Sequence, residues 1–212
     1  MSSQKIRIAL TKGRLEKQTV ALFETIGFNC AQLNSKGRRL ILPMDDYEVV
    51  LAKPADVLTY VEHGACDVGV VGKDTILEMG GTHYEMLDLG FGRCRFALAG
   101  PKGVDFFHGF HERVVATKYP NVAKHFFERK GMDVRIVKIE GSVELAPLLA
   151  FAHAIVDIVE TGGTLRENGL EVIEEIAPIS ARVIVNKASM KLRRAAIEEL
   201  LNNMRLAAQV TG

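Results

Sequence analysis

The residues best suited to chemistry lie between Asp157 and Leu165, which read DIVETGGTL. The apolar run around Asp157, from Ala154 to Val159, is rich in β-branched residues and predicts a buried strand that ends near Glu160. An ionised carboxylate in such a strand is costly unless it faces a polar site or a partner. Asp157 therefore predicts that the tip of this strand faces a binding site.

A paired-glycine turn with flanking hydroxyls, Thr161-Gly162-Gly163-Thr164, follows this strand. Glycines adopt positive φ and let a ligand approach backbone N–H groups, while threonine hydroxyls donate to phosphate oxygens. A helix over residues 164–168 would add its positive dipole end. The pattern indicates a phosphate-binding turn. The alternative is an ordinary strand-to-helix turn with a threonine cap.

Basic residues follow two other predicted strands. A strand over residues 5–10 ends in Lys12-Gly13-Arg14, and a strand over residues 47–52 ends at Lys53, before a helix that starts at Pro54. Ligands of open α/β folds bind outside the carboxyl ends of strands, and cations there clamp polyphosphates. The alternative for Lys12 and Arg14 is a pair of solvated charges beside a glycine turn.

Composition excludes several classes of protein. The chain has 212 residues, 48% of them hydrophobic, and a net charge of +1, so it can bury a large core and has no basic field for nucleic acid or an anionic membrane surface. Its three cysteines lack CxxC spacing, which argues against a disulfide framework. The N-terminal apolar run is too short for a signal peptide or a membrane span, so we expect a cytoplasmic protein.

The remaining pattern alternates strands and helices, which is typical of an α/β fold. The irregular segment 101–113 is interpreted as a crossing point. It contains His108 and His111, whose spacing is compatible with a metal site but better explained by a loop. Further strands are predicted over residues 38–42, 67–71, 91–99, 113–117, 134–139 and 180–186, and helices over residues 15–23, 121–130, 143–150 and 190–210.

A longer stretch that begins at Glu144, ELAPLLAFAHAIVDIVETGGTL, resembles the signature of ATP phosphoribosyltransferase, the first enzyme of histidine biosynthesis. The Lys-Gly-Arg turn and the segment LAKPADVLTYVEHGACDVGVVGKD resemble the N-terminal half of the same family. The chain departs from the family pattern at Ala150, where relatives have Gly, and at His153, where many have Asp. Signature residues are matched at Glu144, Ala152, Ile155, Asp157, Thr161, Gly162, Thr164 and Leu165.

The resemblance implies an α/β, two-lobed fold like that of type II periplasmic binding proteins, with the active site in the cleft between the lobes. Residues 1–92 and 178–212 would form the first lobe, and residues 93–177 the second lobe with the phosphate-binding turn. It also implies that the enzyme transfers the phosphoribosyl group of phosphoribosyl pyrophosphate to adenine nitrogen 1 of ATP. No covalent enzyme intermediate is needed, so the protein positions and neutralises two polyanions.

The resemblance assigns the site residues and the partners as well. Mg²⁺ is expected to be held mainly by substrate phosphates, with no protein ligand assigned. Because the chain ends after its closing helix, we expect histidine to be sensed by a synthetase-like regulatory subunit, with a homodimer inside the hetero-oligomer. Phosphoribosyl pyrophosphate is assigned to Glu144, Asp157, Glu160, Thr161, Gly162, Gly163 and Thr164, and the nucleotide or pyrophosphate to Lys12, Gly13, Arg14 and Lys53.

Three other functions would require different features of the sequence. A non-catalytic binding protein of the same shape would carry an export signal, and a histidine-pathway regulatory subunit would lack the TGGT turn. A purine-salvage phosphoribosyltransferase would carry two adjacent acidic residues, whereas this chain has the spaced pair Asp157 and Glu160.

Overall fold

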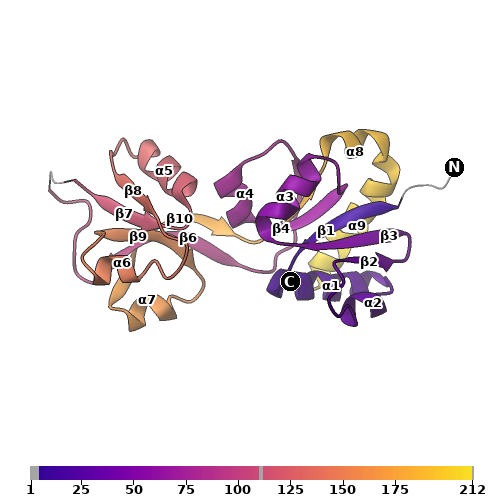
Figure 1. Cartoon of the computed structure of the whole chain (residues 1–212), viewed down its shortest axis with the longest axis horizontal. Coiled ribbons are helices and arrows are strands. Elements are labelled where there is room, and N and C mark those ends of the chain that lie inside the picture. The colour runs from indigo at the N-terminus through magenta and orange to yellow at the C-terminus, as the bar shows by residue number, and fades with distance from the viewer. Residues whose placement is uncertain (1–4, 110–111, 212) are drawn as a thin grey trace. The chain divides into compact units, whose positions relative to one another are not determined.

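The computed structural model describes residues 5–109 and 112–211, which form two compact units (Figure 1). Unit 1 comprises Met1–Gly92 and Ser180–Gly212, and unit 2 comprises Arg93–Ile179. The chain therefore leaves unit 1 after residue 92, and segment 101–113 lies inside unit 2 instead of at a crossing. The return falls two residues later than predicted, because strand β10 (Leu170–Ile179) stays paired with β6 (Cys94–Pro101) along its whole length.

Unit 1 is built on a six-stranded sheet with the order β2-β3-β1-β4-β11-β5. Its central strands β1, β3 and β4 are parallel, so their carboxyl ends meet at one edge of the sheet. Strand β4 is buried throughout, as expected of a strand covered on both faces. The strands are β1 (Ile6–Thr11), β2 (Ile41–Met44), β3 (Tyr47–Ala52), β4 (Val68–Gly72), β5 (Tyr84–Asp88) and β11 (Ala181–Val185).

Helices cover both faces of this sheet. Buried side chains of α1 and α9 pack in one hydrophobic cluster, and those of α3 and α4 pack in another on the opposite face. The alternation along β1 explains this arrangement, since Ile8 and Leu10 belong to the first cluster and Ala9 to the second. The helices are α1 (Arg14–Ile26), α2 (Ala31–Asn34), α3 (Pro54–Glu62), α4 (Lys73–Met79), α8 (Lys187–Leu192) and α9 (Arg194–Thr211).

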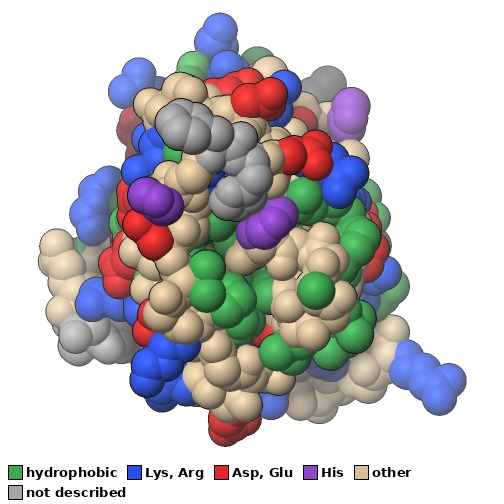
Figure 2. Space-filling view, turned by 90° about the vertical axis from the view of Figure 1, so that its left-hand side faces the viewer, with side chains coloured by type: hydrophobic (Ala, Val, Ile, Leu, Met, Phe, Trp, Pro, Cys, Tyr) green, Lys and Arg blue, Asp and Glu red, His purple; other side chains and the backbone are tan. Residues whose placement is uncertain are grey.

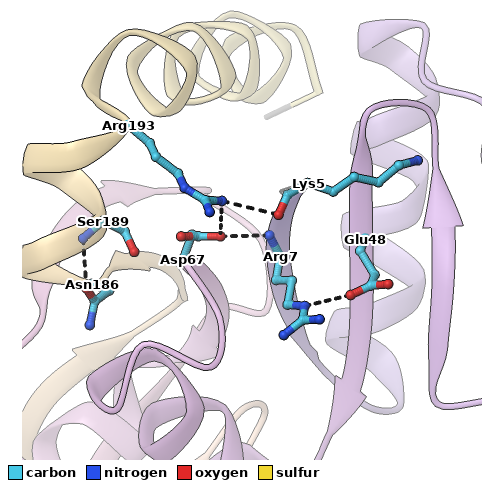
Figure 3. A network of polar contacts seen from close by, with 7 residues as sticks. All are labelled: Lys5, Arg7, Glu48, Asp67, Asn186, Ser189 and Arg193. Atoms are coloured by element: carbon cyan, nitrogen blue, oxygen red, sulfur yellow. Dashed lines mark hydrogen bonds and ion pairs between the residues drawn. The ribbon is translucent and has the colours of Figure 1, made fainter. Parts of the chain in front are cut away.

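A polar network breaks the closing helix that was predicted over residues 190–210. Arg193 lies between α8 and α9, and its guanidinium donates to the buried Asp67 carboxylate at 3.2 Å and to the Lys5 carbonyl oxygen at 3.2 Å (Figure 3). The same Asp67 oxygen accepts from the Arg7 backbone N–H at 2.9 Å. Asn186 caps α8 by accepting from two backbone N–H groups. The network fixes the C-terminal helices at the amino ends of β1 and β4, away from their carboxyl ends.

Unit 2 is built on a five-stranded sheet with the order β10-β6-β9-β7-β8. Strands β7, β8 and β9 are parallel, and Figure 1 shows α5 on one face of the sheet and α6 and α7 on the other. The helix predicted over residues 143–150 is a single turn, and β6 includes Gly100 and Pro101. The remaining elements are β7 (Val114–Thr117), α5 (Pro120–Arg129), β8 (Arg135–Lys138), α6 (Leu145–Leu148), β9 (Ala154–Val159) and α7 (Gly163–Glu167).

The surface of unit 2 carries several large apolar side chains. Figure 2 shows hydrophobic side chains gathered among charged ones at the end of this unit that lies on the left in Figure 1. Around α6, Leu145, Leu148, Leu149 and Phe151 are at least half exposed, Leu149 to 74%. Within the described ranges, no helix has the length and apolar character needed to cross a membrane.

The cysteines form no disulfide. Cys30 and Cys66 are buried free thiols, and Cys94 is a partly buried one. Burial raises the pKa of Cys30 and of Cys66 to about 11 in each case. Both thiols are therefore protonated and unreactive at neutral pH.

Candidate functional site

The turn that joins β9 to α7 contains the predicted Thr161-Gly162-Gly163-Thr164 sequence. Gly162 has φ 73° and is the N-cap of α7, so this position needs the left-handed conformation that favours glycine. The sequence allows positive φ at both glycines, and only Gly162 uses it, because Gly163 lies in the helix. The Arg166 guanidinium donates to the Thr161 carbonyl oxygen at 3.0 Å and fixes the turn from the helix side.

Helix α7 contributes less to anion binding than expected. It has five residues, and it begins at Gly163, one residue before the predicted start. Its N-cap is Gly162, and the Thr161 hydroxyl accepts from the Gly163 backbone N–H at 3.4 Å, so a threonine does contribute to the start of the helix. The dipole of so short a helix is small. Backbone N–H groups and the exposed hydroxyls of Thr161 and Thr164 are what this turn offers to a phosphate.

Asp157 lies on the face of β9 that packs against α6 and α7. Side chains alternate along a strand, so Asp157 shares this face with Ile155 and Val159, which belong to one hydrophobic cluster with Ala146 of α6 and Leu165 of α7. On the neighbouring strand β6, the residue in register with Asp157 is the uncharged Ala97. The carboxylate therefore sits half-buried at the rim of an apolar layer.

Glu144 lies beside Asp157, because it is the N-cap residue of α6, which packs on β9. Burial raises the pKa of Asp157, and the negative charge of Glu144 raises it further. A backbone hydrogen bond at Ile158 and the positive charge of Lys118 lower the pKa of Asp157 in the opposite direction. The structure thus brings Glu144, Asp157 and the glycine turn together, with two carboxylates whose oxygens are suited to hydroxyl donors. Glu160, also predicted, is exposed, and its carbonyl oxygen accepts from Arg95 at 3.3 Å.

Lys118 was not singled out from the sequence, although the same signal that selected Lys53 applies to it. It directly follows β7, just as Lys53 directly follows β3, at the carboxyl end of a parallel strand. Strand β7 is the parallel neighbour of β9, with Thr117 in register with Val156. The next residue on each strand, Lys118 after Thr117 and Asp157 after Val156, therefore lies at the same level of the sheet.

The predicted cations of unit 1 come together at the carboxyl ends of β1 and β3. Thr11 is in register with Ala52, and the Lys12 backbone N–H donates to the Ala52 carbonyl oxygen at 2.9 Å. Lys12, Arg14 and Lys53 are all exposed. Gly13, between the first two, has φ 102° and ψ −132°, a conformation that side chains rarely adopt. The turn thus presents cations around a backbone bend that needs glycine.

A buried carboxylate holds this turn from beneath. Glu16 is 5% exposed, and its carboxylate accepts from the Gly13 backbone N–H at 3.3 Å and from the Lys36 ammonium. This is the reciprocal half of a capping box, and it occupies the N-terminus of α1 with a protein anion. The exposed cations, and not the start of α1, are therefore what unit 1 offers to a polyanion.

The two departures from the family pattern have different consequences. Ala150 has φ 53°, so a left-handed backbone explains why glycine suits this position, and its exposed methyl group meets no crowding. His153 contributes to the fold, because its Nδ1 accepts from the Val114 backbone N–H at 3.0 Å and helps to anchor the start of β7.

In residues 5–109 and 112–211, no three His, Cys, Asp or Glu side chains gather as they would around a metal ion. His108 and His111, whose spacing is compatible with a metal site but better explained by a loop, lie partly outside this part of the chain, since His111 is not described.

Comparison with known proteins places this chain in one family. The family model described as ATP phosphoribosyltransferase matches residues 53–206. A protein of that name from Clostridium kluyveri is 55% identical over 205 residues, which cover 96% of this chain and 94% of the relative. The relative from Clostridium acetobutylicum is 56% identical over 202 residues, with 94% of each chain covered.

Solved structures agree on the fold. A chain of the ATP phosphoribosyl transferase (HisG:HisZ) complex from Thermotoga maritima has a TM-score of 0.83 and 34% identity, covering 96% of this chain and 98% of that one. The periplasmic aliphatic sulphonate binding protein SsuA from Escherichia coli has a TM-score of 0.61 and 13% identity, with 99% and 74% covered. The second likeness shows the two-lobed fold alone.

Proposed function

Because this chain belongs to the ATP phosphoribosyltransferase family and transfers the phosphoribosyl group of phosphoribosyl pyrophosphate to adenine nitrogen 1 of ATP, we propose that unit 2 binds the phosphoribosyl donor. The products are phosphoribosyl-ATP and pyrophosphate, and the reaction belongs to histidine biosynthesis. The donor site is proposed to consist of Glu144, Asp157 and the turn from Glu160 to Thr164.

The observation that carries this proposal is the convergence of two carboxylates with the glycine turn at one end of β9. The Thr161 and Thr164 hydroxyls and nearby backbone N–H groups would bind the 5-phosphate. The ribose hydroxyls would donate to Asp157 and Glu144, which lie beside each other. Hydrogen-bond donors for a phosphate and hydrogen-bond acceptors for hydroxyl groups would thus lie next to one another, as binding of a ribose 5-phosphate requires.

We propose that the cations of unit 1 bind the other phosphates. Lys12, Arg14 and Lys53 are exposed cations that follow β1 and β3, two strands that are parallel neighbours in the sheet. Their positive charges suit pyrophosphate or a triphosphate. Gly13 would let a phosphate approach the backbone closely. Mg²⁺ is proposed to enter with the substrate phosphates, since it keeps several waters and needs few protein ligands. When bound, it would neutralise charge that develops on pyrophosphate.

In the proposed reaction, the lone pair of adenine nitrogen 1 forms a bond to the anomeric carbon of the donor. The bond from that carbon to pyrophosphate breaks, and the pyrophosphate leaves with the electron pair. Positive charge develops on the ribose ring as the leaving group departs. The carboxylates of Asp157 and Glu144 would stabilise this charge while they hold the hydroxyls, and the cations of unit 1 would hold the leaving group.

A partner chain is the remaining part of the proposal. The Thermotoga maritima relative was solved as a complex of two kinds of chain, and we propose that this chain also assembles with a regulatory subunit that senses histidine, around a homodimer. The exposed leucines around α6 support a protein contact, because large apolar patches often mark interfaces. The test is the activity of the isolated chain titrated with histidine, repeated with the regulatory subunit. Strong inhibition of the isolated chain would contradict the proposal.

The donor site is tested most simply at Gly163. A Cβ added there would have only Thr161 Oγ1 within 4 Å, at 3.6 Å, so Gly163→Val is expected to fold while its side chain obstructs the phosphate. The Michaelis constant for phosphoribosyl pyrophosphate should rise about tenfold or more, the value of one lost charge-assisted hydrogen bond. An unchanged constant in a folded variant would refute the assignment of the turn.

A further inference from the structure

We propose that Lys118 is a third member of the phosphoribosyl site, a positioning residue that follows β7 at the level of Asp157 on β9 and whose ammonium faces the carboxylates of Asp157 and Glu144. This inference rests on the proposed donor site at Asp157 and extends it to a residue on a different strand.

The backbone fixes Lys118 at the level of Asp157. Strands β7 and β9 are parallel neighbours, and their last paired residues are Thr117 and Val156. Each strand continues by one residue, to Lys118 and to Asp157. Residues at one level of adjacent parallel strands project to the same face of a sheet. Lys118 therefore approaches the face on which Asp157 and Glu144 lie.

The buried hydroxyl of Thr117 fixes the two residues that flank Lys118 in the chain. The Thr117 side chain is fully buried, and its Oγ1 donates to the Val156 carbonyl oxygen at 2.6 Å. The same oxygen accepts from the Tyr119 backbone N–H at 2.9 Å, so the two neighbours of Lys118 are tied to β9. The Tyr119 ring also packs edge-on against Phe96, with centroids 4.8 Å apart. These contacts hold the backbone of Lys118 in a fixed position beside the sheet, while its side chain stays exposed.

The charges around Asp157 favour a cation nearby. Burial and the charge of Glu144 raise the pKa of Asp157, whereas a backbone hydrogen bond at Ile158 and, to a smaller extent, the positive charge of Lys118 lower it. The facing residue of β6 is Ala97, and the Arg166 guanidinium on α7 is directed to the Thr161 carbonyl oxygen. Without a cation, one of two adjacent carboxylates tends to stay protonated, and a protonated carboxyl group has lost acceptor capacity.

One other carboxylate competes for Lys118. Glu140 is exposed, and its pKa is lowered mainly by a hydrogen bond from Lys138, whose ammonium is 2.7 Å away, with a smaller contribution from Lys118. Because Lys138 already pairs with Glu140, the ammonium of Lys118 remains available to the Asp157 pair.

The experiment compares Lys118→Met with Lys124→Met, which removes an exposed lysine of the same unit that pairs with Glu128 at 3.8 Å on α5. In Lys118→Met, the Michaelis constant for phosphoribosyl pyrophosphate should rise about tenfold, and that for ATP should change less than about twofold. The acid limb of its kcat/KM profile should move to higher pH, because Asp157 would protonate more readily. Lys118→Arg should restore both values, and Lys124→Met should match the parent protein.

A second readout is independent of activity. Carbon-13 NMR titration of the Asp157 carboxyl group should give a higher pKa in Lys118→Met than in the parent protein and Lys124→Met. Parent-like kinetics with an unchanged Asp157 titration would overturn the role of Lys118, and so would an equal loss for both substrates without a shift of the acid limb. Asp157→Asn separates the two proposals. If that variant binds the donor normally, the donor site itself is wrong; if it fails while Lys118→Met is normal, only the role of Lys118 is wrong.

Discussion

The two candidate turns, one in each unit, would use opposite means to bind phosphates. The turn after β1 presents Lys12 and Arg14 to solvent, and the buried carboxylate of Glu16 supports its backbone. The turn after β9 presents hydroxyls and glycines, and its charged neighbours are the carboxylates Asp157 and Glu144. Both turns join a strand to a helix and both need a glycine with positive φ. They therefore share a backbone design and differ in charge.

This difference in charge determines which forces each turn would use. Exposed cations attract a polyanion over several ångströms, and salt screens that attraction. Hydroxyls, N–H groups and half-buried carboxylates act at hydrogen-bond distance, so they recognise shape and are screened less. Unit 1 would therefore attract the pyrophosphate end of the donor, and unit 2 would recognise its ribose 5-phosphate end.

The largest effect is expected at Asp157. Asp157→Asn should lower kcat/KM for phosphoribosyl pyrophosphate by about tenfold to a hundredfold, because hydrogen bonds to a charged acceptor contribute about 1.5–3 kcal/mol. Steady-state kinetics at saturating ATP measure this loss. An unchanged catalytic efficiency would show that Asp157 of unit 2 does not bind the donor.

The same variant should be more stable than the parent protein at neutral pH. The folded state raises the pKa of Asp157, so its contribution to stability is complete below the pKa of the unfolded chain and is lost as pH rises through the folded value. Asparagine behaves like the neutral form at every pH. Denaturant unfolding should therefore show the gain at pH 7 and little gain near pH 3. A loss of stability at pH 7 would contradict the electrostatic account.

How far the sequence predicts this structure differs from element to element. The strands before both turns, and the residues at their tips, follow from apolar runs and glycine positions. Strand β10 was missed, because it carries Glu171, Glu174 and Glu175 and two register irregularities that disturb its alternation. It lies at the edge of the sheet, where charges and bulges discourage pairing with another chain.

Tertiary contacts account for the other errors. The closing helix breaks at Arg193 because this side chain reaches Asp67, 126 residues away in sequence. Strand β2 was predicted three residues too early, and it contains Pro43, which an edge strand tolerates. Local pattern also cannot show that Gly162, and not Gly163, takes the left-handed conformation.

A smaller effect is expected in unit 1. Lys12→Met should raise the Michaelis constant for phosphoribosyl pyrophosphate or ATP by about fivefold at low salt, since an exposed ion pair contributes up to about 1 kcal/mol. This difference should shrink as salt is added. Lys17→Met, which removes an exposed lysine of α1, is the matched control. A salt-independent loss, or an equal loss in the control, would show that Lys12 does not act through its charge.

The glycine pair gives a smaller and purely structural contrast. Gly162→Ala should lower the free energy of unfolding by about 1 kcal/mol, because alanine is strained at φ 73° and its Cβ would lie 3.3 Å from Arg166 Nη1. Gly163→Ala should leave stability unchanged or raise it slightly, since it starts a helix without crowding. Thermal unfolding of both variants tests the contrast, and equal losses would mean that the turn conformation is misassigned.

The smallest effect is expected at Ala150, outside both turns. Ala150→Gly removes the backbone strain of an alanine in the left-handed conformation, but it also raises the conformational entropy of the unfolded chain. We therefore expect a net stabilisation below about 1 kcal/mol. The Michaelis constants should not change. A measurable change in substrate affinity would show that residue 150 acts on the donor site as well as on the fold.

The most direct test of the division between the units is calorimetric titration with ribose 5-phosphate, which lacks the pyrophosphate. The account predicts that Asp157→Asn abolishes its binding, whereas Lys12→Met binds it like the parent protein with little dependence on salt. Loss of ribose 5-phosphate binding in Lys12→Met, with normal binding in Asp157→Asn, would contradict the assignment of the two ends of the donor.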